Sequence, residues 1–285
     1  MAPSTAGVRE RTFADFSTIE PELRAGHRQW LARAQNFWCE WVELGGDGTF
    51  SFDSDAEGLL IAIEGDLQAR HEPSGAPAVR VPAHSVAILP PGRCTLAGAA
   101  GAVCLMLASQ RGDLAGRRVL NEDAYREPDA RIVPSGRSWR RKRRAGIEVL
   151  DIDAVRAAPD KPRLKMLQTE TLSVNIVEYT GARDRGALSP HAHSSFEQGS
   201  LAIAGRFVHH LRVPWTPDAD AWRDDEHLAA PSPSLLVVPV EMIHTTEGVE
   251  GGHHFLLDIF SPPREDFIRK GWVFNAGDYE AEGAS

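Results

Sequence analysis

The clearest chemical signal in this chain is a set of closely spaced histidines. His191 and His193 are separated by one residue, and residues at that spacing face the same side of an extended strand. Two imidazoles on one face can bind a single ion of a metal such as Fe, Ni, Zn, Cu or Mn. A third histidine, His244, begins a later apolar segment. The spacing therefore predicts a site for one divalent transition metal.

A further ligand is expected between these histidines, where Glu197 and Gln198 follow the first pair. A carboxylate is the stronger ligand for a hard cation, which favours Glu197 on chemistry alone. Adjacent residues of a strand face opposite sides, so only one of the two side chains can reach the metal. The residue types by themselves leave the choice between Glu197 and Gln198 open.

The elements that must position these residues form an internal repeat. Each half has an apolar strand that ends at a glycine, then a strand that ends at a proline, and then a third apolar run. Short apolar runs separated by glycine and proline predict an all-β sandwich or barrel. The matched segments are 57–67 with 197–207, 85–90 with 234–239, and 102–107 with 254–260. Two barrels fit the length of 285 residues, with few short helices, expected over 21–34 and 263–270.

Two motifs of the second half resemble the paired sequence motifs of the cupin superfamily. The first is His-x-His, four residues, a Glu or Gln, six residues and a glycine, and it matches His191 to Gly205. The second is a proline, four residues and a histidine, and it matches Pro239 to His244. The resemblance covers most of residues 164–275.

This resemblance implies a bicupin, with two cupin (jelly-roll-like) β-barrels in tandem. It places Gln198 at the ligand position, because six residues separate it from Gly205, and it turns Glu197 outward. The implied cofactor is one divalent transition metal: nickel, zinc, iron or manganese. The implied metal ligands are His191, His193, Gln198 and His244.

The first half lacks an equivalent set of donors. The positions that match the four ligands are Ser51, Asp53, Gly58 and, by a looser alignment, Thr95. At most one of these is a good ligand, so the first barrel is expected to be metal-free. The expected division is a degenerate barrel over 1–135, a basic linker over 136–160 and a metal-binding barrel over 161–285.

Asp258, Phe260 and Arg264 end the second half in the string Asp-x-Phe-Ser-Pro-x-Arg. Alternation puts Asp258 and Phe260 on one face of a strand, where a buried carboxylate is costly unless it is paired or functional. The string resembles the small KdgF-like cupins that linearise unsaturated uronates from pectin and alginate. That resemblance implies catalysis by Asp258, substrate binding by Arg264 and a pocket lined by Phe260.

Composition limits the partners of the protein. A formal net charge of −9 argues against nucleic acid, no apolar run approaches a membrane span, and the first residues do not form a secretion signal. Three cysteines without Cys-x-x-Cys spacing favour a reducing cytoplasm. We expect a cytoplasmic protein with a small-molecule substrate, either as an intramolecular barrel pair or as a homodimer.

Three functions are compatible with this reading. The first is a metal-dependent isomerase or lyase acting on a small oxygenated acid, with the metal as Lewis acid and Asp258 as acid and base. The second is an Fe(II)-dependent dioxygenase. The third is a non-enzymatic barrel that binds a small molecule. An insertion over 213–233, between the two metal motifs, is a candidate lid over any of these sites.

Overall fold

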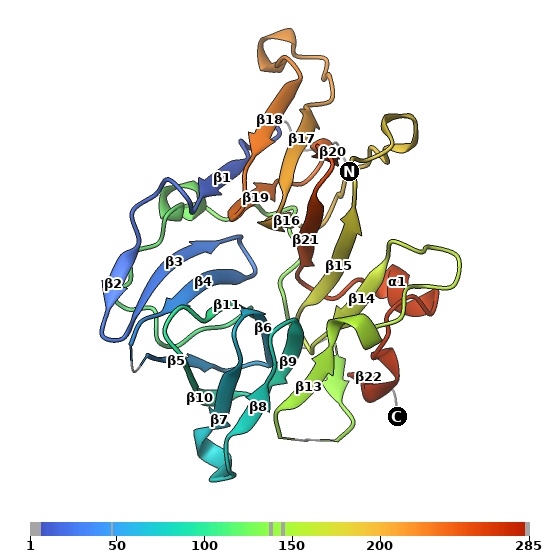
Figure 1. Cartoon of the computed structure of the whole chain (residues 1–285). Helices are drawn as coiled ribbons and strands as arrows, with labels where there is room; N and C mark the ends of the chain where they lie inside the picture. The colour runs from blue at the N-terminus through green and yellow to red at the C-terminus, as the bar shows by residue number, and fades with distance from the viewer. Residues whose placement is uncertain (1–6, 47, 137–138, 144–145, 283–285) are drawn as a thin grey trace.

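The computed structural model describes residues 7–46, 48–136, 139–143 and 146–282, and within these ranges the regular secondary structure is almost entirely β (Figure 1). The one α-helix of the described residues, α1 (Glu265–Arg269), lies in the expected segment 263–270. The helix expected over 21–34 is wrong, because two strands occupy that segment. Residues 137–138 and 144–145 of the expected basic linker lie outside the described residues.

The first domain consists of two facing sheets with an apolar interior. The seven-stranded sheet contains β2 (Glu22–Arg24), β3 (His27–Arg33), β4 (Trp38–Leu44), β6 (Gly58–Glu64), β9 (Ser85–Leu89), β11 (Val103–Ala108) and β13 (Glu148–Asp151). The four-stranded sheet contains β5 (Thr49–Ser54), β7 (Leu67–His71), β8 (Val79–Val81) and β10 (Gly92–Gly98).

The second domain repeats this arrangement with a larger and a smaller sheet. The six-stranded sheet contains β1 (Thr12–Asp15), β14 (Lys165–Gln168), β15 (Ser173–Thr180), β16 (Gln198–Ala204), β19 (Ser234–Val238) and β21 (His253–Phe260). The three-stranded sheet contains β17 (Arg206–Arg212), β18 (Glu226–Ala230) and β20 (Ile243–Val249). A small separate ribbon pairs β12 (Trp139–Arg141) with β22 (Tyr279–Ala281).

The expectation of an all-β tandem is confirmed, but the expected closed barrels are open sandwiches. In the described part of the chain, no hydrogen-bonded strand pair joins the two sheets of either domain. The residues that the structure describes also form six short 3-10 segments: η1 (Glu72–Ser74), η2 (Glu122–Tyr125), η3 (Ile152–Ala154), η4 (Arg185–Ala187), η5 (Ala219–Ala221) and η6 (Ala276–Asp278). No helix among the described residues is long and apolar enough to cross a membrane.

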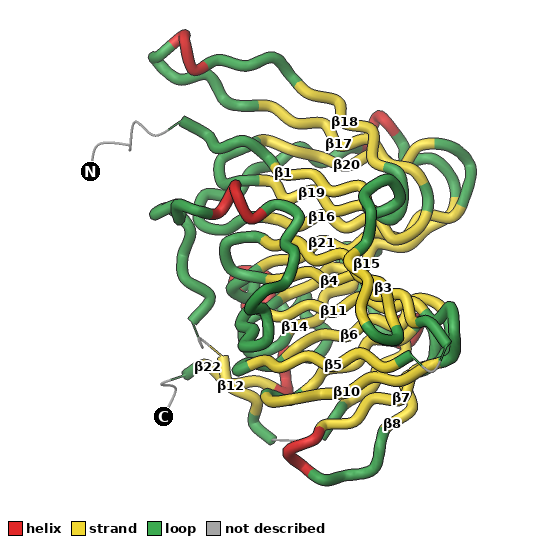
Figure 2. Tube along the Cα trace, turned by 90° about the vertical axis from the view of Figure 1, so that its left-hand side faces the viewer, coloured by secondary structure: helices red, strands yellow, loops and turns green. Residues whose placement is uncertain are grey.

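The four sheets stack as layers, with the two largest in the middle (Figure 2). The largest apolar cluster lies between the seven-stranded and six-stranded sheets, so the domains share a core. Trp41 and Leu59 enter it from the first domain, and Leu201 and Leu257 enter it from the second. Burial of this apolar area holds the domains together.

The internal repeat is visible as equivalent strands. β6 lies between β9 and β11 as β16 lies between β19 and β21. Both β6 and β16 end in a register shift followed by a glycine with positive φ, 72° at Gly65 and 94° at Gly205. A side chain at Gly205 would meet the backbone oxygen of His253 at 2.6 Å, so the close approach of the neighbouring strand requires glycine there.

The two domains also exchange strands. β1 pairs with β19 at the edge of the second domain's large sheet, and β13 pairs with β9 at the edge of the first domain's large sheet. The expected boundaries, at 135 and 161, therefore separate each of these strands from the sheet that it joins. The exchange pairs the outer edges of β19 and β9, so β1 and β13 become the edge strands of the two large sheets.

Candidate metal centre

Two backbone segments bring the predicted histidines together. His191 and His244 form an antiparallel bridge in which each backbone N–H donates to the carbonyl oxygen of the other, at 3.1 and 2.8 Å. The backbone N–H of Glu241 donates to the carbonyl oxygen of His193 at 2.6 Å. The His-x-His segment therefore runs beside the start of β20, so residues distant in sequence meet at one point.

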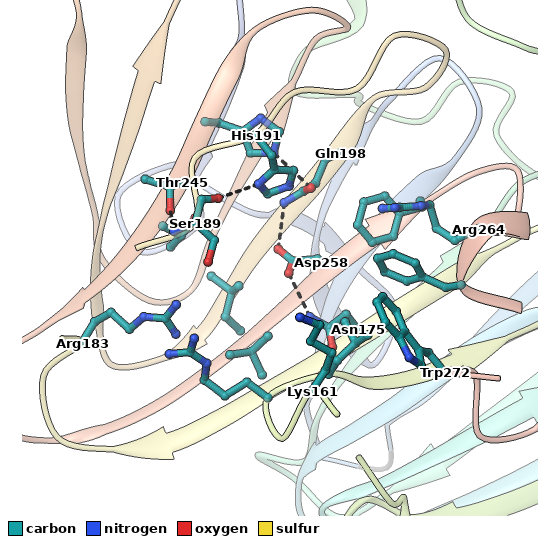
Figure 3. Close-up of a pocket in the computed structure, with 18 of the residues that line it drawn as sticks. Lys161, Asn175, Arg183, Ser189, His191, Gln198, Thr245, Asp258, Arg264 and Trp272 are labelled. Carbon is teal, nitrogen blue, oxygen red and sulfur yellow. Dashed lines mark hydrogen bonds between the residues drawn. The ribbon is translucent and has the colours of Figure 1, made fainter. Parts of the chain in front are cut away.

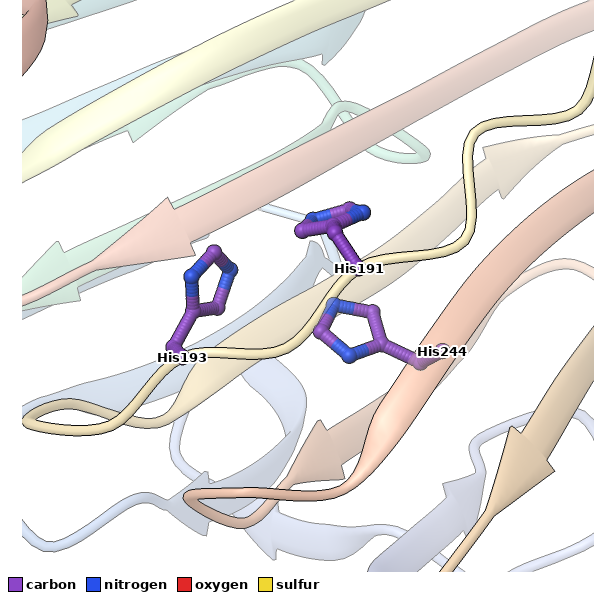
Figure 4. A group of neighbouring side chains, drawn as sticks. All are labelled: His191, His193 and His244. Carbon is purple, nitrogen blue, oxygen red and sulfur yellow. The ribbon is translucent and has the colours of Figure 1, made fainter. Parts of the chain in front are cut away.

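The three imidazoles converge (Figure 4). One ring nitrogen from each of His191, His193 and His244 lies within 4.8 Å of the others. Phe196 and Phe260 flank the His193 ring, with centroid distances of 4.6 and 5.7 Å. These aromatic contacts hold the ring in one orientation without using its nitrogens.

Gln198 is the fourth residue of the cluster. Its Oε1 lies 3.0 Å from Nε2 of His193 and 3.1 Å from Nε2 of His244. Its Nε2 donates to Oγ of Ser200 and to Oδ1 of Asp258, at 3.1 and 3.0 Å. An ionised carboxylate oxygen accepts only, so with Asp258 ionised this contact directs the amide nitrogen to Asp258 and the amide oxygen to the imidazoles.

Glu197 points to the other side of the strand. Its carboxylate accepts hydrogen bonds from the backbone N–H of Gln35 at 2.7 Å and from the hydroxyl of Tyr125 at 3.2 Å. Both partners belong to the first half of the chain. Glu197 is thus a contact between domains, and Gln198 alone of the two faces the histidines.

The donor set fits a cation. Nδ1 of His191 lies 2.8 Å from the carbonyl oxygen of Ser189, and Nδ1 of His244 lies 3.0 Å from that of Met242. A carbonyl oxygen accepts, so both rings donate from Nδ1 and present the lone pair of Nε2 to the cluster. Nε2 of His244 and Oε1 of Gln198 are then two acceptors in contact, which a positive ion between them would stabilise.

At neutral pH, protonation of the ring does not supply a donor for the contact between Nε2 of His244 and Oε1 of Gln198. Burial lowers the pKa of His193 to about 3 and the pKa of His244 to about 4. Both rings are therefore neutral at pH 7, which is the form that binds a metal.

Asp258 lies next to the ligand cluster. Oδ1 accepts from Gln198 and from Oγ of Ser200, the latter at 3.1 Å, and Oδ2 accepts from Nδ2 of Asn175 at 3.2 Å. The backbone N–H of Lys165 donates to Oδ1 of Asn175, which fixes that amide with its NH2 toward Asp258. Burial raises the pKa of Asp258, and the three hydrogen bonds only partly oppose this effect.

A cavity of about 680 Å³ opens beside the cluster (Figure 3). His191, Gln198, His244 and Asp258 line it, together with the predicted pocket residue Phe260. Its remaining walls are largely apolar, with a few cationic side chains. An oxygenated small molecule in this cavity can contact both the ligand cluster and the carboxyl group of Asp258.

Arg264 also lines the cavity, but a carboxylate already occupies its guanidinium. Nε and Nη2 donate to the two oxygens of Asp266 at 2.9 and 2.8 Å. The same group stacks over the rings of Phe260 and Phe267, at 5.0 and 3.8 Å from their centroids. The structure thus places Arg264 in the aromatic wall of the cavity, with its charge partly neutralised.

Several residues that line the cavity were not predicted from the sequence. Asn175 could have been found, because it is a polar residue in the apolar strand β15. The cationic residues lie on loops, where no periodicity shows which way a side chain points. These overlooked lining residues are Lys161, Arg163, Asn175, Tyr179, Arg183 and Trp272.

The first domain differs at each matched position. Ser51 and Thr95 face each other across β5 and β10 with their hydroxyl oxygens 3.0 Å apart, outside the apolar interior. The interior positions of these strands are Phe52 and Cys94. The alignment was therefore one residue out of step here, and a one-residue shift moves a side chain to the other face.

Gly58 is correctly matched to Gln198, since they begin the equivalent strands β6 and β16. A Cβ at Gly58 would lie 2.4 Å from the terminal methyl group of Met106. The side chain of Met106 thus fills the space where the second domain has its amide ligand.

The insertion over 213–233 does not cover the cavity. It extends the hairpin formed by β17 and β18, and none of its residues lines the cavity. Trp215 and Trp222 stack on each other near its tip, with ring centroids 4.5 Å apart.

Comparisons with known proteins reveal a likeness in structure but none in sequence. No protein-family model and no curated protein match the chain. The structure is similar to oxalate decarboxylase from Bacillus subtilis, with a TM-score of 0.59, 14% identity, and coverage of 90% of this chain and 78% of the other. It is also similar to AerE from Microcystis aeruginosa, with a TM-score of 0.57, 8% identity, and coverage of 86% and 98%.

At these identities the likeness shows the fold alone. It extends over both domains, because the matched regions cover most of this chain in each case. The chain therefore has the bicupin fold, with two cupin domains in tandem.

Proposed function

We propose that this protein is a metal-dependent isomerase or lyase that acts on a small oxygenated acid. The observation that carries the proposal is the convergence of three imidazoles and an amide oxygen at one end of a cavity of about 680 Å³. Beside them lies a carboxyl group whose pKa burial raises. Metal ligands and an acid–base group thus share one cavity wall.

His191, His193, Gln198 and His244 are the residues that would hold the metal. A bound divalent ion supplies Lewis-acid stabilisation of negative charge that develops on a substrate oxygen. The hydrogen bonds from the rings to Ser189 and Met242 keep the Nε2 lone pairs directed at that position.

Asp258 would move the proton. Its carboxyl group is held by three donors, from Gln198, Ser200 and Asn175, so it has a fixed orientation toward the cavity. A carboxyl group whose pKa is raised above its ordinary value is better able to give a proton to a substrate as well as to remove one. Its direct contact with Gln198 couples it to the ligand cluster.

The structural neighbours support metal chemistry on an acid. The Bacillus subtilis oxalate decarboxylase acts on a small carboxylic acid and has Mn(II) centres. The Asp-x-Phe-Ser-Pro-x-Arg string favours an unsaturated uronate as the first substrate to test, and oxalate is the natural comparison. Manganese, nickel, zinc and iron all suit the proposed donor set.

A metal-reconstitution assay tests the proposal. Protein purified without chelator or metal-affinity tag is loaded with Mn, Fe, Ni or Zn and incubated with unsaturated uronates and with oxalate, in air and without oxygen. We expect turnover that requires metal and not oxygen. Asp258→Asn should lower the rate by roughly 10²–10⁴-fold while metal content stays unchanged.

Other outcomes would reject this function. Turnover that requires both iron and oxygen would make the protein a dioxygenase. A protein that binds these acids but converts none of them with any metal would be a binding protein. An active Asp258→Asn variant would remove Asp258 from the proton transfer.

A further inference from the structure

Two arginines on loops line the same cavity as the metal candidate. Arg163 precedes β14, and Arg183 follows β15. Figure 3 shows Arg183 and Arg264 on opposite sides of Asp258. The cavity thus has a cationic end that is separate from Arg264.

This end has no carboxylate partner. In the described ranges, neither Arg163 nor Arg183 forms an ion pair, although many other arginines do. Arg185, two residues beyond Arg183, lies 3.6 Å from Glu247. Arg183 donates to the carbonyl oxygen of Ala187 at 3.3 Å, but its buried Nε has no hydrogen-bond partner.

An unpaired guanidinium in this place is unfavourable without a ligand. Burial and the neighbouring charge of Arg163 both lower the pKa of Arg183. A buried N–H without a partner costs free energy until an acceptor binds it. An oxyanion between the two guanidinium groups would satisfy the orphan donor and offset the repulsion of the two charges.

We propose that Arg163 and Arg183 form a carboxylate-binding subsite for the substrate. The substrate's hydroxyl or carbonyl oxygens would lie at the end formed by the ligand cluster and Asp258. This proposal rests on the proposed function and narrows its substrate class. The class is acids in which several carbon atoms separate the carboxylate from the reacting oxygens.

The walls between the two ends agree with such a substrate. Val177, Phe207 and Leu256 line the cavity and offer apolar surface to a carbon skeleton. The volume of about 680 Å³ is also far larger than a two-carbon acid requires. Arg264 is less suited to this task because Asp266 already pairs with the Nε–Nη2 edge of its guanidinium.

A matched pair of sugars tests the subsite. Titration calorimetry would compare D-glucuronate with D-glucose, which lacks the carboxylate, on both Mn(II)-loaded and metal-free protein. We expect glucuronate to bind at least about tenfold more tightly, as for a hydrogen-bonded charge pair. Arg183→Gln and Arg163→Gln should each remove most of this preference. Arg185→Gln is the control and should keep it.

The outcomes separate the subsite from the proposed function. No preference for glucuronate, no measurable binding of it, or a preference that survives both substitutions would overturn the subsite. Tighter binding of D-glucose 6-phosphate than of glucuronate would overturn the assignment to a carboxylate. Protein that takes up no metal but keeps an Arg183-dependent preference would overturn the proposed function and support the subsite.

Discussion

The interiors of the two domains differ sharply although their strands have the same arrangement. In the first domain Leu60 faces Met106 across β6 and β11, and both belong to a continuous apolar cluster. In the second domain Ser200 faces Asp258 at the equivalent pair of positions across β16 and β21. One sandwich is filled with apolar side chains, and the other holds polar groups around a cavity.

This difference shows that the sheets can form without the polar groups of the candidate site. The first domain forms the same strand order with an apolar interior, so the polar groups of the second domain are not required for the fold. Buried polar groups lower stability unless they are satisfied, and cavities cost packing energy. The second interior is therefore better explained by function than by stability.

The largest expected effect concerns metal binding, which should belong to the second domain alone. We expect about one equivalent of metal in the wild-type protein and none in the His191→Ala/His244→Ala double variant, because two imidazole ligands are lost. Elemental analysis after purification without chelator measures this. Asp53→Ala, which removes an acidic side chain from the first domain, is the control, and loss of metal in that variant would contradict the assignment.

The next prediction concerns stability and exchanges the residue types at one equivalent interior position of the two domains. Met106→Asp should lower the free energy of unfolding by about 3–5 kcal/mol, because it buries a carboxylate without a partner. Asp258→Met should cost less than about 1 kcal/mol or be stabilising, as functional polar groups are often not optimal for stability. Denaturant unfolding of both variants checks the difference. Equal losses would mean that the polar interior is structural.

A smaller effect tests the contact between Gly58 and Met106. Gly58→Gln should cost about 1–3 kcal/mol, because its Cβ would meet the methyl group of Met106 at 2.4 Å. Met106→Ala opens that space, so the double variant should be more stable than the sum of the two single losses predicts. A double-mutant cycle measures the coupling, expected to exceed about 0.5 kcal/mol. Additive losses would show that the two residues do not compete for one space.

The smallest effect concerns a feature that the two domains share. Glu57 accepts from the hydroxyl of Tyr279 at 2.9 Å and from the backbone N–H of Glu170 at 3.1 Å, as Glu197 does from partners in the first half. Burial raises the pKa of Glu57 and outweighs the opposing charge of Arg141.

The folded protein therefore holds the Glu57 proton more strongly than the unfolded chain. This contribution to stability is fully present below the unfolded pKa, 4.5, and is lost as pH rises through the higher folded pKa. Glu57→Gln should remove this loss, which is at most about 1.4 kcal/mol per pH unit for one proton. Thermal unfolding from pH 4 to 8 measures it. Parallel pH profiles of the variant and the wild type would contradict the shift.

The sequence predicted the all-β tandem and the four residues that converge at the candidate metal centre. It could do so because the ligands share a short motif and the strands repeat with glycine and proline at fixed places. It failed at Ser51 and Thr95, because an unseen shift of one residue reverses the face of a strand. Arg163 and Arg183 were missed because loop residues have no periodicity that shows their direction.

Partners close in sequence were also overlooked. Asp266 lies two residues after Arg264 and forms an ion pair with it, which the family resemblance did not indicate. The exchanged strands β1 and β13 have four residues each, too few for a recognisable hydrophobic pattern. Their pairing depends on which sheet edges the rest of the fold leaves open.

The exchange of β1 has a consequence during synthesis on the ribosome. β1 is made early, yet the strand that it joins, β19, follows roughly 220 residues later, which is about 10–45 s at the usual pace of about 5–20 residues per second. The first domain can begin to fold in that interval while β1 still waits for its partner. A nascent chain stalled before β19 would thus present β1 as an unpaired segment, open to chaperones and proteases until the last third of the protein emerges.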